Sequence, residues 1–439
     1  MTMESYTILF ILVGTLLVAT VSKRIRGTVI SLPMIYTLFG LAVAFLFPDL
    51  VSLQYNSPIV KTIAELTLVL VLASDSSRIK LKNLSRYHDL SIRMLLLGLP
   101  LTFVAGTLVG ALIFTGSNIW LLAILAVALA PIDSSLAESS VDNPNVPMRI
   151  RQTLNVEGGM DDGITLPFIL LFISLAVSTE IGGKTGSFLL FTAQKIGFGI
   201  IAGLIMGYLA ARYISWGDKR GWISSQFQKI AWLALVLLTY GAAEAIGGNG
   251  FIAAFFFGII SGNTIEKQES NRLHRFAEVE NTLLMMLTFM FYGAVMLFPA
   301  LQHINIEMII YAILSLTLAR MLPVAISLIG TKLRLETVLY LGWFGPRGIA
   351  SILYVYTILQ AEGIGRQEMI FSLVMITIFF SMLMHGISAV PLTNRYAKRI
   401  AQLEKNGLAQ AETQYVPGMP TRKATIKPAS FPSESLDPS

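Results

Sequence analysis

Long apolar segments recur along almost the entire chain, and they constrain the fold more than any other feature of the sequence. A helix needs about 20 mainly apolar residues to cross the hydrocarbon core of a bilayer. The segments are continuously apolar and do not alternate with polar residues, which argues against a β-barrel. We therefore expect an all-α polytopic membrane protein with about 13 transmembrane helices. The predicted segments are 6–22, 27–47, 60–74, 94–115, 119–137, 157–178, 187–211, 227–246, 250–262, 281–299, 306–330, 336–359 and 368–391.

The composition excludes several other classes of protein. Charged residues make up 13% of the chain and hydrophobic residues 54%, whereas about a quarter of the residues of an average soluble domain are charged. So few charges could not cover the surface of a water-soluble globule, and they also exclude a disordered chain or a coiled coil. The chain has no cysteine, which excludes a disulfide scaffold and a thiolate metal site.

The basic residues between the segments predict the orientation in the membrane. Nineteen lysines and arginines lie in the loops after segments 1, 3, 5, 7, 9 and 11. The opposite loops hold only Lys61, Lys184 and Arg366. By the positive-inside rule, the N-terminus is expected outside and the C-terminus in the cytoplasm, with the protein in the cell (inner) membrane. The net charge of +6 is then explained by topology and lipid contact, and no nucleic-acid partner is expected.

The composition changes after the last apolar segment. We expect a transmembrane domain over residues 1–392 and a cytoplasmic tail over 393–439. Residues 393–410 could form a short amphipathic surface helix, whereas the Pro-, Ser- and Thr-rich sequence from about 414 is typical of disorder. Within the seventh segment, three small residues four apart predict close helix packing. They are Gly199, Gly203 and Gly207.

Charged residues inside the apolar segments point to a functional site. An ionised group at the bilayer centre costs at least about 2.5–3.5 kcal/mol, so such groups usually pair or line a polar path. They cluster here in the stretches ALAPIDSSLAES with Asp133, NVEGGMDDG with Glu157, Asp161 and Asp162, and WFGPRGIAS with Arg347.

Two prolines predict interrupted helices at this site. Pro131 and Pro346 each stand beside a charged residue within a segment, where proline breaks the helical hydrogen bonds. The two segments are seven apart in the chain, so they cross the membrane in opposite directions. This is the expected signature of inverted repeats whose two discontinuous helices cross at a binding site. The carbonyls freed at 130–132 could bind a cation, and Arg347 could neutralise the facing helix ends.

The acidic cluster suggests competition between protons and cations. Glu157 and Asp161 share one helical face, whereas Asp162 points about 100° away. With Arg347 as the one expected cation, the three carboxylates cannot all be ionised cheaply, so at least one should be protonated or hold a metal ion. Hard oxygen ligands without cysteine or histidine suit Na⁺, Li⁺ or K⁺. Elsewhere, Asp75 could simply mark the end of a segment, and Arg320 is expected to form a helix-bridging ion pair or a backbone clamp.

At these residues the chain resembles the monovalent cation/proton antiporter superfamily, specifically the bacterial sodium/proton exchanger type, from about residue 5 to 392. The resemblance implies a thirteen-helix fold with a core domain and a dimerisation domain. It also implies a homodimer that works by elevator-like movement of the core. The most specific stretches are APIDSSLAESSVDNPNVPMRIRQTLNVEGGMDDG, EAIGGNGFIAAFFFGIISGN, FAEVENTLLMMLTFMFYGAV and GWFGPRGIASILY.

The resemblance also assigns roles to single residues. It implies that Asp133 and Asp162 bind the cation and the proton, and that Glu157 and Arg347 form a structural ion pair. Three positions depart from the family pattern: Ile132 replaces a threonine, Gly158 a serine and Asp161 an asparagine. Ile132 can then offer only its carbonyl as a cation ligand, and Asp161 gives the double-aspartate form associated with the electrogenic branch. We expect Asp161 to be a third cation- and proton-binding group or a partner of Arg347. The expected supporting residues are Ser134, Gly158, Arg320 and Asp75.

We therefore expect a secondary antiporter that exchanges Na⁺, Li⁺ or K⁺ for H⁺ by elevator-type alternating access. No cofactor is expected apart from the transported ions. An intramembrane aspartyl protease is an alternative, but its Gly-x-Gly-Asp pattern is absent, since the chain reads Gly-Met-Asp-Asp at 159–162. A cation channel is a second alternative, although the chain lacks any repeated filter segment. An enzyme is therefore not expected.

Overall fold

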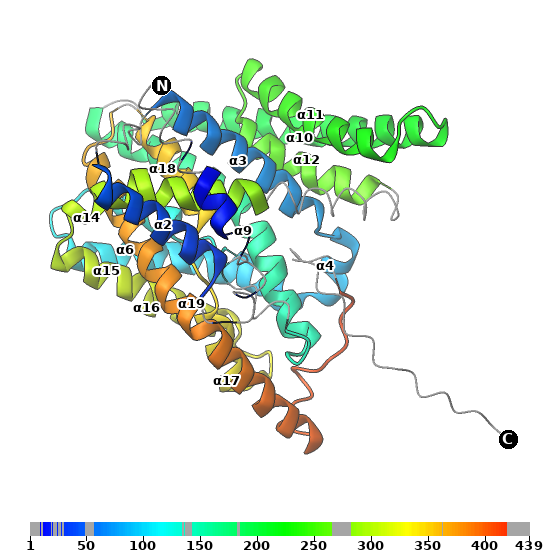
Figure 1. Cartoon of the computed structure of the whole chain (residues 1–439), viewed down its shortest axis with the longest axis vertical. Helices are drawn as coiled ribbons and strands as arrows, with labels where there is room; N and C mark the ends of the chain where they lie inside the picture. The colour runs from blue at the N-terminus through cyan, green and yellow to red at the C-terminus, as the bar shows by residue number, and fades with distance from the viewer. Residues whose placement is uncertain are drawn as a thin grey trace.

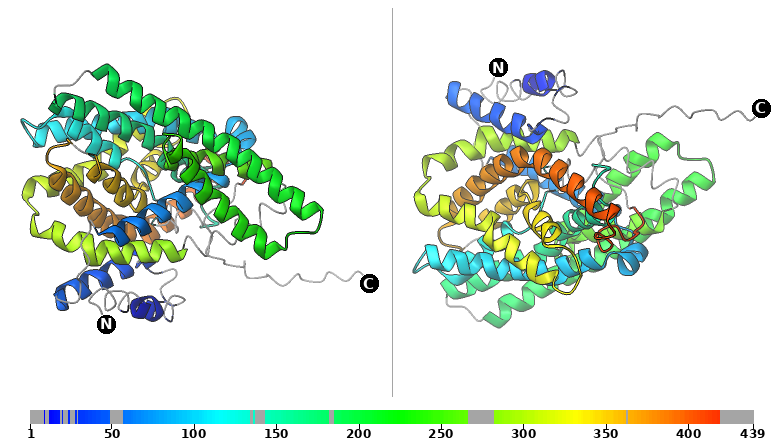
Figure 2. Two further views of the ribbon diagram at one scale, coloured as in Figure 1. Left: turned by 90° about the horizontal axis from the view of Figure 1, so that it is seen from above. Right: turned by 90° about the horizontal axis from the view of Figure 1, so that it is seen from below.

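The computed structural model describes residues 30–48, 57–133, 143–181, 185–265, 282–361 and 363–418, together with positions 9, 12–18, 20, 24, 28 and 136. Within this part of the chain, every regular element is a helix. The helices pack into one bundle, with α10, α11 and α12 together along one side (Figures 1 and 2).

The element bounds are as follows. The first half of the described chain forms α2 (Leu32–Leu46), α3 (Pro58–Ser77), α4 (Leu81–Tyr87), α5 (Asp89–Arg93), the π-helix η2 (Met94–Gly98), α6 (Leu99–Ile113), α7 (Ile119–Ala128), α9 (Met148–Ile181) and α10 (Thr185–Lys219). The second half forms α11 (Ser225–Ala245), α12 (Gly250–Thr264), the π-helix η3 (Tyr292–Leu297), α14 (Phe298–Gln302), α15 (Ile306–Leu316), α16 (Leu318–Ser327), α17 (Leu335–Trp343), α18 (Ile349–Leu359) and α19 (Gln367–Lys405).

The described helices follow the predicted apolar segments from 27–47 onward. Six helical stretches are long and apolar enough to cross a membrane, and α2, α7, α12 and α18 are shorter apolar helices. The protein is therefore a multi-pass membrane protein. Segment 6–22 is described only at positions 9, 12–18 and 20, so the total of about 13 spans stays a prediction. The six long stretches are Asp89–Ile113, Met148–Glu180, Gly186–Lys219, Thr282–Gln302, Ile306–Ser327 and Gln367–Lys405.

Two of the short helices end where the prolines predicted an interruption. Helix α7 stops at Ala128, and residues 129–133 continue without helical structure. Residues 344–348 likewise separate α17 from α18. Proline has no N–H to donate and clashes with the preceding turn, which explains both interruptions. Most of the chain after 133, up to 142, lies outside the described residues, so the second half of the first interrupted segment cannot be compared with its prediction.

The interrupted helices lie in the middle of the protein. Nearly all of α7 and α18 is buried, as expected for helices that are apolar on every side. Around them, glycine stripes allow neighbouring helices to approach closely. A Cβ atom at Gly199 would lie 2.7 Å from the Asn249 carbonyl oxygen, and one at Gly207 would lie 2.8 Å from the Phe257 carbonyl oxygen. The close packing predicted for this stripe of α10 is therefore confirmed, with α12 as its partner.

The structure describes the predicted tail over residues 393–418. Residues 393–405 are the last turns of α19, and residues 406–418 pack against the protein. Ala409 and Val416 are buried, so two apolar side chains hold residues 406–418 on the protein. The helix that was expected within 393–410 is present as far as Lys405, as the continuation of α19. Residues 419–439 lie outside the described residues.

Polar contacts also hold this returning segment. Glu412, only 1% exposed, accepts hydrogen bonds from the Arg334 N–H at 2.9 Å and from the Thr337 hydroxyl at 3.1 Å. Arg149, near the start of α9, donates to the Ala411 carbonyl at 2.5 Å and to Asp89 at 2.8 and 2.9 Å. The segment therefore contacts the starts of α9 and α17, and Arg149 connects it in turn to Asp89 at the start of α5.

Candidate functional site

The two non-helical segments, 129–133 and 344–348, meet in the protein interior, and we call this meeting point the junction. The Asp133 N–H donates to the Pro346 carbonyl at 2.7 Å. The Asp133 carboxylate accepts from the Ile349 N–H at 3.0 Å. Since Ile349 is the first residue of α18, the carboxylate lies at a helix N-terminus, where unsatisfied N–H groups and the helix dipole favour negative charge.

Gly348 makes this contact sterically possible. A Cβ atom at this position would collide with the Asp133 carboxylate. The backbone of Gly348 has φ −155°, so the glycine is needed for space rather than for an unusual φ. The Gly-Pro-Arg-Gly sequence of the second interruption therefore brings Asp133 onto the start of α18.

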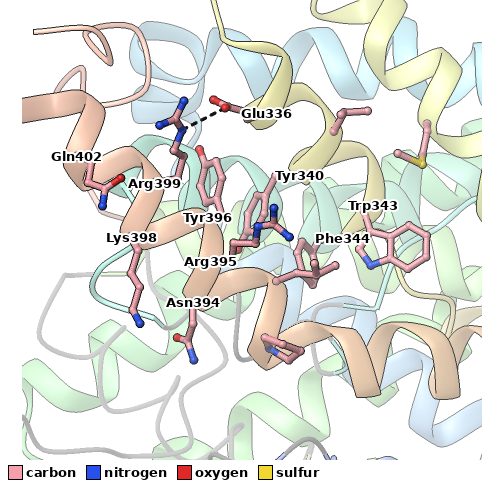
Figure 3. Close-up of a pocket in the computed structure, with 14 residues that line it drawn as sticks. Glu336, Tyr340, Trp343, Phe344, Asn394, Arg395, Tyr396, Lys398, Arg399 and Gln402 are labelled. Carbon is pink, nitrogen blue, oxygen red and sulfur yellow. Dashed lines mark hydrogen bonds and ion pairs between the residues drawn. The ribbon is translucent and has the colours of Figure 1, made fainter. Parts of the chain in front are cut away.

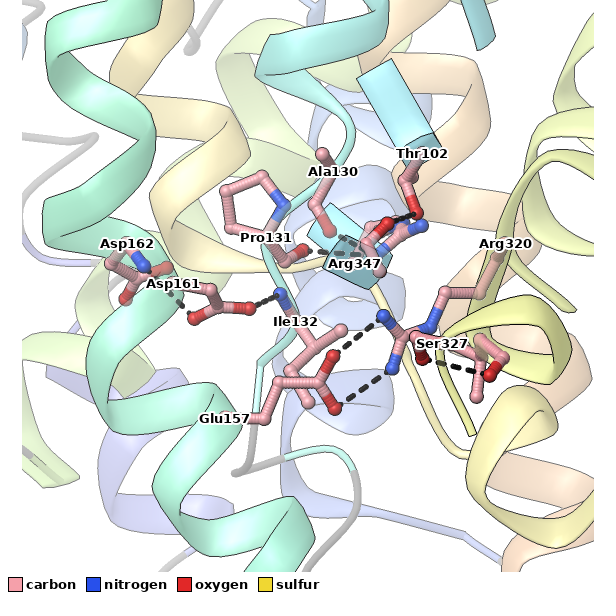
Figure 4. Close-up of polar contacts among 12 residues, drawn as sticks. Thr102, Ala130, Pro131, Ile132, Glu157, Asp161, Asp162, Arg320, Ser327 and Arg347 are labelled. Carbon is pink, nitrogen blue, oxygen red and sulfur yellow. Dashed lines mark hydrogen bonds and ion pairs between the residues drawn. The ribbon is translucent and has the colours of Figure 1, made fainter. Parts of the chain in front are cut away.

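Arg347 satisfies the opposite helix end (Figure 4). Its buried guanidinium donates to the carbonyls of Ala130 and Pro131 at 2.5 and 3.3 Å. These carbonyls follow the C-terminus of α7, where the last carbonyls lack helical donors and the dipole is negative. The Arg347 N–H in turn donates to the Ser381 hydroxyl of α19 at 2.7 Å. Two of the carbonyls that were expected to be free for a cation are thus bound by an arginine.

Glu157 pairs with a different arginine from the one expected. Its carboxylate accepts two hydrogen bonds from Arg320 of α16, at 2.7 and 2.9 Å, and both side chains are 1% exposed (Figure 4). The predicted Glu157–Arg347 pair is therefore corrected to Glu157–Arg320, because Arg347 is directed at the carbonyl end of α7. The helix-bridging ion pair expected for Arg320 is confirmed. A bidentate arginine–carboxylate pair is both strong and geometrically specific.

Asp161 connects α9 to the first non-helical segment, 129–133. One of its carboxylate oxygens accepts from the Ile132 N–H at 2.6 Å, and the other accepts from the Asp162 N–H at 2.9 Å. Figure 4 shows Asp161 directed at the backbone of Ile132. The side chain is 1% exposed, so Asp161 is held by backbone amides in a buried position.

Asp162 and Asp133 are the less enclosed acids of the junction. They are 6% and 7% exposed, against 1% for Glu157 and Asp161. The Asp162 carbonyl accepts a hydrogen bond from the Tyr354 hydroxyl of α18. Both carboxylates therefore lie in the protein interior, and neither side chain lies on the outer surface.

With this geometry in place, the sequence can be compared with known proteins. The family described as "Sodium/hydrogen exchanger, transmembrane" matches residues 8–395. The chain belongs to the sodium/hydrogen exchanger family. Because this is a family of transporters, the expectation that the chain is not an enzyme is confirmed, and the aspartyl protease alternative falls away.

The curated relatives in the exchanger family are distant. A probable Na⁺/H⁺ antiporter of Schizosaccharomyces pombe is 24% identical over 54% of this chain and 33% of its own length. The Na⁺/H⁺ antiporter 2 of Zygosaccharomyces rouxii is 25% identical over 62% of this chain and 35% of its own. The K⁺/H⁺ antiporter NhaP2 of Shewanella sp. (strain ANA-3) is 22% identical over 65% and 48%. The chain thus spans about a third to a half of the length of these relatives.

A solved structure in the exchanger family shows the same fold. The sodium proton antiporter MjNhaP1 from Methanocaldococcus jannaschii, determined at pH 8, superposes with a TM-score of 0.72. The superposition covers 90% of this chain and 98% of that chain at 18% sequence identity. The arrangement of helices is therefore shared along nearly the whole of both chains.

The remaining expected site residues of this exchanger lie at different distances from the junction. Gly158 is buried beside Glu157 on α9. Asp75 is 5% exposed near the end of α3, and its carbonyl oxygen would lie 3.6 Å from a Cβ atom at Gly159. The backbone of Asp75 therefore lies against the acidic turn of α9. Ser134 lies outside the described residues.

The junction does not resemble a resident metal centre. Among the residues that the structure describes, no three histidine, aspartate or glutamate side chains gather closely enough to hold a metal ion. A cation bound here would therefore have fewer carboxylate ligands and would need backbone carbonyls, hydroxyls or water to complete its shell.

Three residues that contact the junction were not predicted. The role of Gly348 could have been predicted, since it stands in the Gly-Pro-Arg-Gly motif, where a second glycine suggests that another segment approaches the backbone closely. The roles of Ser381 and Tyr354 could not have been predicted, because a single hydroxyl inside an apolar segment usually forms a hydrogen bond within its own helix. Their partners, the backbone of Arg347 and of Asp162, come from other helices.

Proposed function

We propose that this protein is a secondary antiporter that exchanges a monovalent cation for H⁺ at Asp133 and Asp162. The observation that supports this most directly is the position of the Asp133 carboxylate, at the start of α18 and at the meeting point of two interrupted segments. Broken helices that meet within the membrane typically form the ion sites of transporters. Family membership and the Na⁺/H⁺ and K⁺/H⁺ antiporters among the relatives support the same reaction class.

We assign transport to Asp133 and Asp162, as the family resemblance implies, and the contacts of the two other acids support structural roles for those acids. Glu157 is paired with Arg320, and Asp161 is held by the Ile132 and Asp162 amides. Asp133 and Asp162 are also buried, at 7% and 6% exposed. A buried carboxylate is costly when bare and is stabilised by a proton or a cation. The two ions therefore compete for the same oxygens.

The choice of ion follows from the ligands. Carboxylate and carbonyl oxygens prefer hard cations, and the site has neither cysteine nor histidine, so the substrate is Na⁺, Li⁺ or K⁺. The Ile132 carbonyl is the backbone ligand that best fits this role, because those of Ala130 and Pro131 accept from Arg347. Asp75 and Gly158 act only as supporting residues beside the acidic turn.

The transport cycle that we infer is alternating access of the elevator type. A core domain that carries the junction would move against a dimerisation domain within a homodimer, with about 13 helices arranged as inverted repeats. The N-terminus would lie outside and the C-terminus in the cytoplasm of the cell (inner) membrane. The likeness in fold to a solved sodium proton antiporter and the concentration of basic residues in alternate loops support this arrangement.

Exchange by the purified full-length protein in liposomes tests the proposal. Na⁺, Li⁺ and K⁺ are compared across a pH series, with and without an imposed membrane potential. Competition predicts a bell-shaped pH profile that moves to lower pH as the cation concentration rises. An apparent KM for the cation that does not depend on pH would contradict competition. Cation flux that dissipates a potential without H⁺ counter-movement would point to the channel alternative instead.

Two substitutions test the assignment of residues. Asp133→Asn and Asp162→Asn should abolish exchange while the protein stays folded and monodisperse. Glu307→Gln is the matched control, because Glu307 is an exposed acid in the first turn of α15, and it should exchange normally. Normal exchange by Asp162→Asn would show that another group carries the ion.

A further inference from the structure

A second feature is a pocket that opens between α17 and the last turns of α19 (Figure 3). Its volume is about 830 Å³, within the usual range of about 300–1,000 Å³ for small-molecule sites. Helix α16 contributes Met321 to its wall. We call it the α17–α19 pocket.

The two ends of the α17–α19 pocket differ in chemistry. Figure 3 shows Trp343 and Phe344 at one end and Lys398 and Gln402 at the other. The apolar part is lined by Met321, Leu339, Trp343, Phe344 and Leu392, and the polar part by Asn394, Arg395, Lys398, Arg399 and Gln402. Between them, the rings of Tyr340 and Tyr396 stack with centroids 4.1 Å apart. A ligand that fills the pocket must therefore be amphipathic.

The polar end carries an excess of positive charge. Glu336 is the one acid in the lining, and it is shared by Arg399 and Arg334, each at 3.3 Å. Arg395 and Lys398 are exposed, and within the described part of the chain neither contacts an acidic side chain. Two cations on one turn of α19 are thus available to a ligand, and they favour an anion.

The pocket lies at the level along α19 where the membrane surface is expected. Leu392 follows the predicted membrane segment 368–391, and Arg395 and Lys398 lie in the next turn. This end of α19 is the cytoplasmic end in the orientation that the loop charges predict. The apolar end of the pocket then faces the acyl chains, and the basic end lies at the level of the headgroups. Basic pockets between transmembrane helices on this side of a membrane bind anionic headgroups.

We propose that the α17–α19 pocket binds an anionic phospholipid of the cytoplasmic leaflet. The phosphate lies against Arg395 and Lys398, and an acyl chain lies against Leu339 and Trp343. A zwitterionic lipid fills the apolar end equally well but gains less from the excess positive charge, so the charge of the headgroup provides the selectivity.

The lipid would stabilise the packing of α17 and α19, the two helices that contact the second segment of the junction. Helix α17 leads directly into residues 344–348, and α19 carries Ser381, which accepts from the Arg347 N–H. The Trp343 ring also donates to the Ser388 hydroxyl at 2.9 Å and so links α17 to α19 beside the pocket. Because a ligand that binds only the folded state stabilises it, anionic lipid should raise the temperature of unfolding.

The test compares lipids on the delipidated full-length protein in an uncharged detergent. Phosphatidylglycerol and phosphatidylcholine with identical acyl chains are added in turn, and inorganic phosphate is added separately. Native mass spectrometry counts the retained lipid, and thermal unfolding gives the change in Tm. We expect at least fivefold greater retention of phosphatidylglycerol than of phosphatidylcholine, and a larger increase in Tm.

Substitutions then locate the effect. Arg395→Gln with Lys398→Gln should remove the preference for phosphatidylglycerol. The matched control is Arg212→Gln with Lys405→Gln, which removes two exposed charges expected on the same side of the membrane but outside the pocket lining. The control should keep the full preference. Because all four side chains are exposed, both double variants should fold.

Several outcomes would overturn the proposal. The pocket is not the site if the Arg395/Lys398 double variant keeps the preference, or if the control loses as much. An equal increase in Tm with inorganic phosphate would show a site for free anions rather than for lipid. Dissociation of a dimer in the Arg395/Lys398 variant, with lipid retention unchanged, would show that a second copy of the chain occupies the surface.

Discussion

Removal of one partner of the buried Glu157–Arg320 pair should destabilise the protein much more than replacement of both partners together. The two side chains are each 1% exposed and lie 2.7 Å apart at their nearest atoms. At 2.7 Å and an effective dielectric constant of about 20, their attraction is about 6 kcal/mol. The transfer of each ion out of water costs several kcal/mol. The pair as a whole therefore contributes little, but either ion alone leaves its transfer cost uncompensated.

The expected magnitudes follow from this balance. Arg320→Met or Glu157→Leu should each lower the free energy of unfolding by about 3–5 kcal/mol. The double variant should recover most of that loss, because apolar side chains of similar volume can replace a buried ion pair at little cost. The two single changes are therefore strongly non-additive, and the double-mutant cycle measures the coupling.

Thermal unfolding of the purified protein in detergent is the assay. Since large proteins often unfold irreversibly, half-lives at a fixed temperature are compared as well. Lys61→Met is the matched control, because the Lys61–Glu65 pair is 3.8 Å long and its side chains are 42% and 28% exposed. Exposed pairs contribute at most about 1 kcal/mol, so the control should hardly change the unfolding temperature.

Two results would refute this reasoning. If Arg320→Met unfolds at the same temperature as the double variant, the isolated glutamate is not buried as the structure places it. If Glu157→Leu couples more strongly to Arg347→Met than to Arg320→Met, then Glu157 pairs with Arg347, as the family resemblance implied.

Three further predictions concern the junction, the returning tail and His88, a buried residue between α4 and α5. Gly348→Ala should lower exchange in proteoliposomes at least tenfold with little change in Tm, because the added Cβ displaces the Asp133 carboxylate from α18; an unchanged rate would contradict this role. Glu412→Ala should lower stability by about 1–3 kcal/mol, since it leaves buried donors unsatisfied, whereas exposed Glu404→Ala should not change the Tm. Burial lowers the pKa of His88 below its ordinary 6.5, so the unfolded chain binds its proton more readily and stability falls as pH falls through 6.5 and below. The Tm of the wild type should therefore fall more steeply between pH 8 and pH 5 than that of His88→Gln, and parallel curves would refute this.

The features that sequence reasoning recovered depend on local chemistry. Pro131 and Pro346 cannot continue a helix wherever they are placed, so the interruptions could be located from the residue type alone. The glycine stripe of α10 is similarly informative, because a spacing of four residues puts all three glycines on one face. The apolar segments also follow from a requirement that every membrane helix must meet. Each of these inferences needs only a few neighbouring residues.

The features that it missed depend on how distant helices are rotated against one another. Arg320 and Arg347 are both intramembrane arginines far along the chain from Glu157, and no local pattern distinguishes them as partners. The resemblance favoured Arg347, but that guanidinium is used by the carbonyl end of α7. The contact of residues 406–418 with the protein was missed for a different reason: it depends on two buried apolar side chains and Glu412, which no sequence pattern distinguishes.

The two arginines of the junction have different negative partners. Under the proposed function, this difference explains how the binding of a cation would be coupled to the release of a proton. Arg320 neutralises Glu157, whereas Arg347 lies against a helix end that carries only about half a negative charge. Asp161 is stabilised by amides, which add no positive charge to the site. If Asp133 or Asp162 released a proton with nothing in exchange, an ionised carboxylate would remain in the protein interior, at a desolvation cost of several kcal/mol. The arrival of a monovalent cation removes that cost. Charge balance alone therefore links the release of one ion to the uptake of the other, without any direct contact between them.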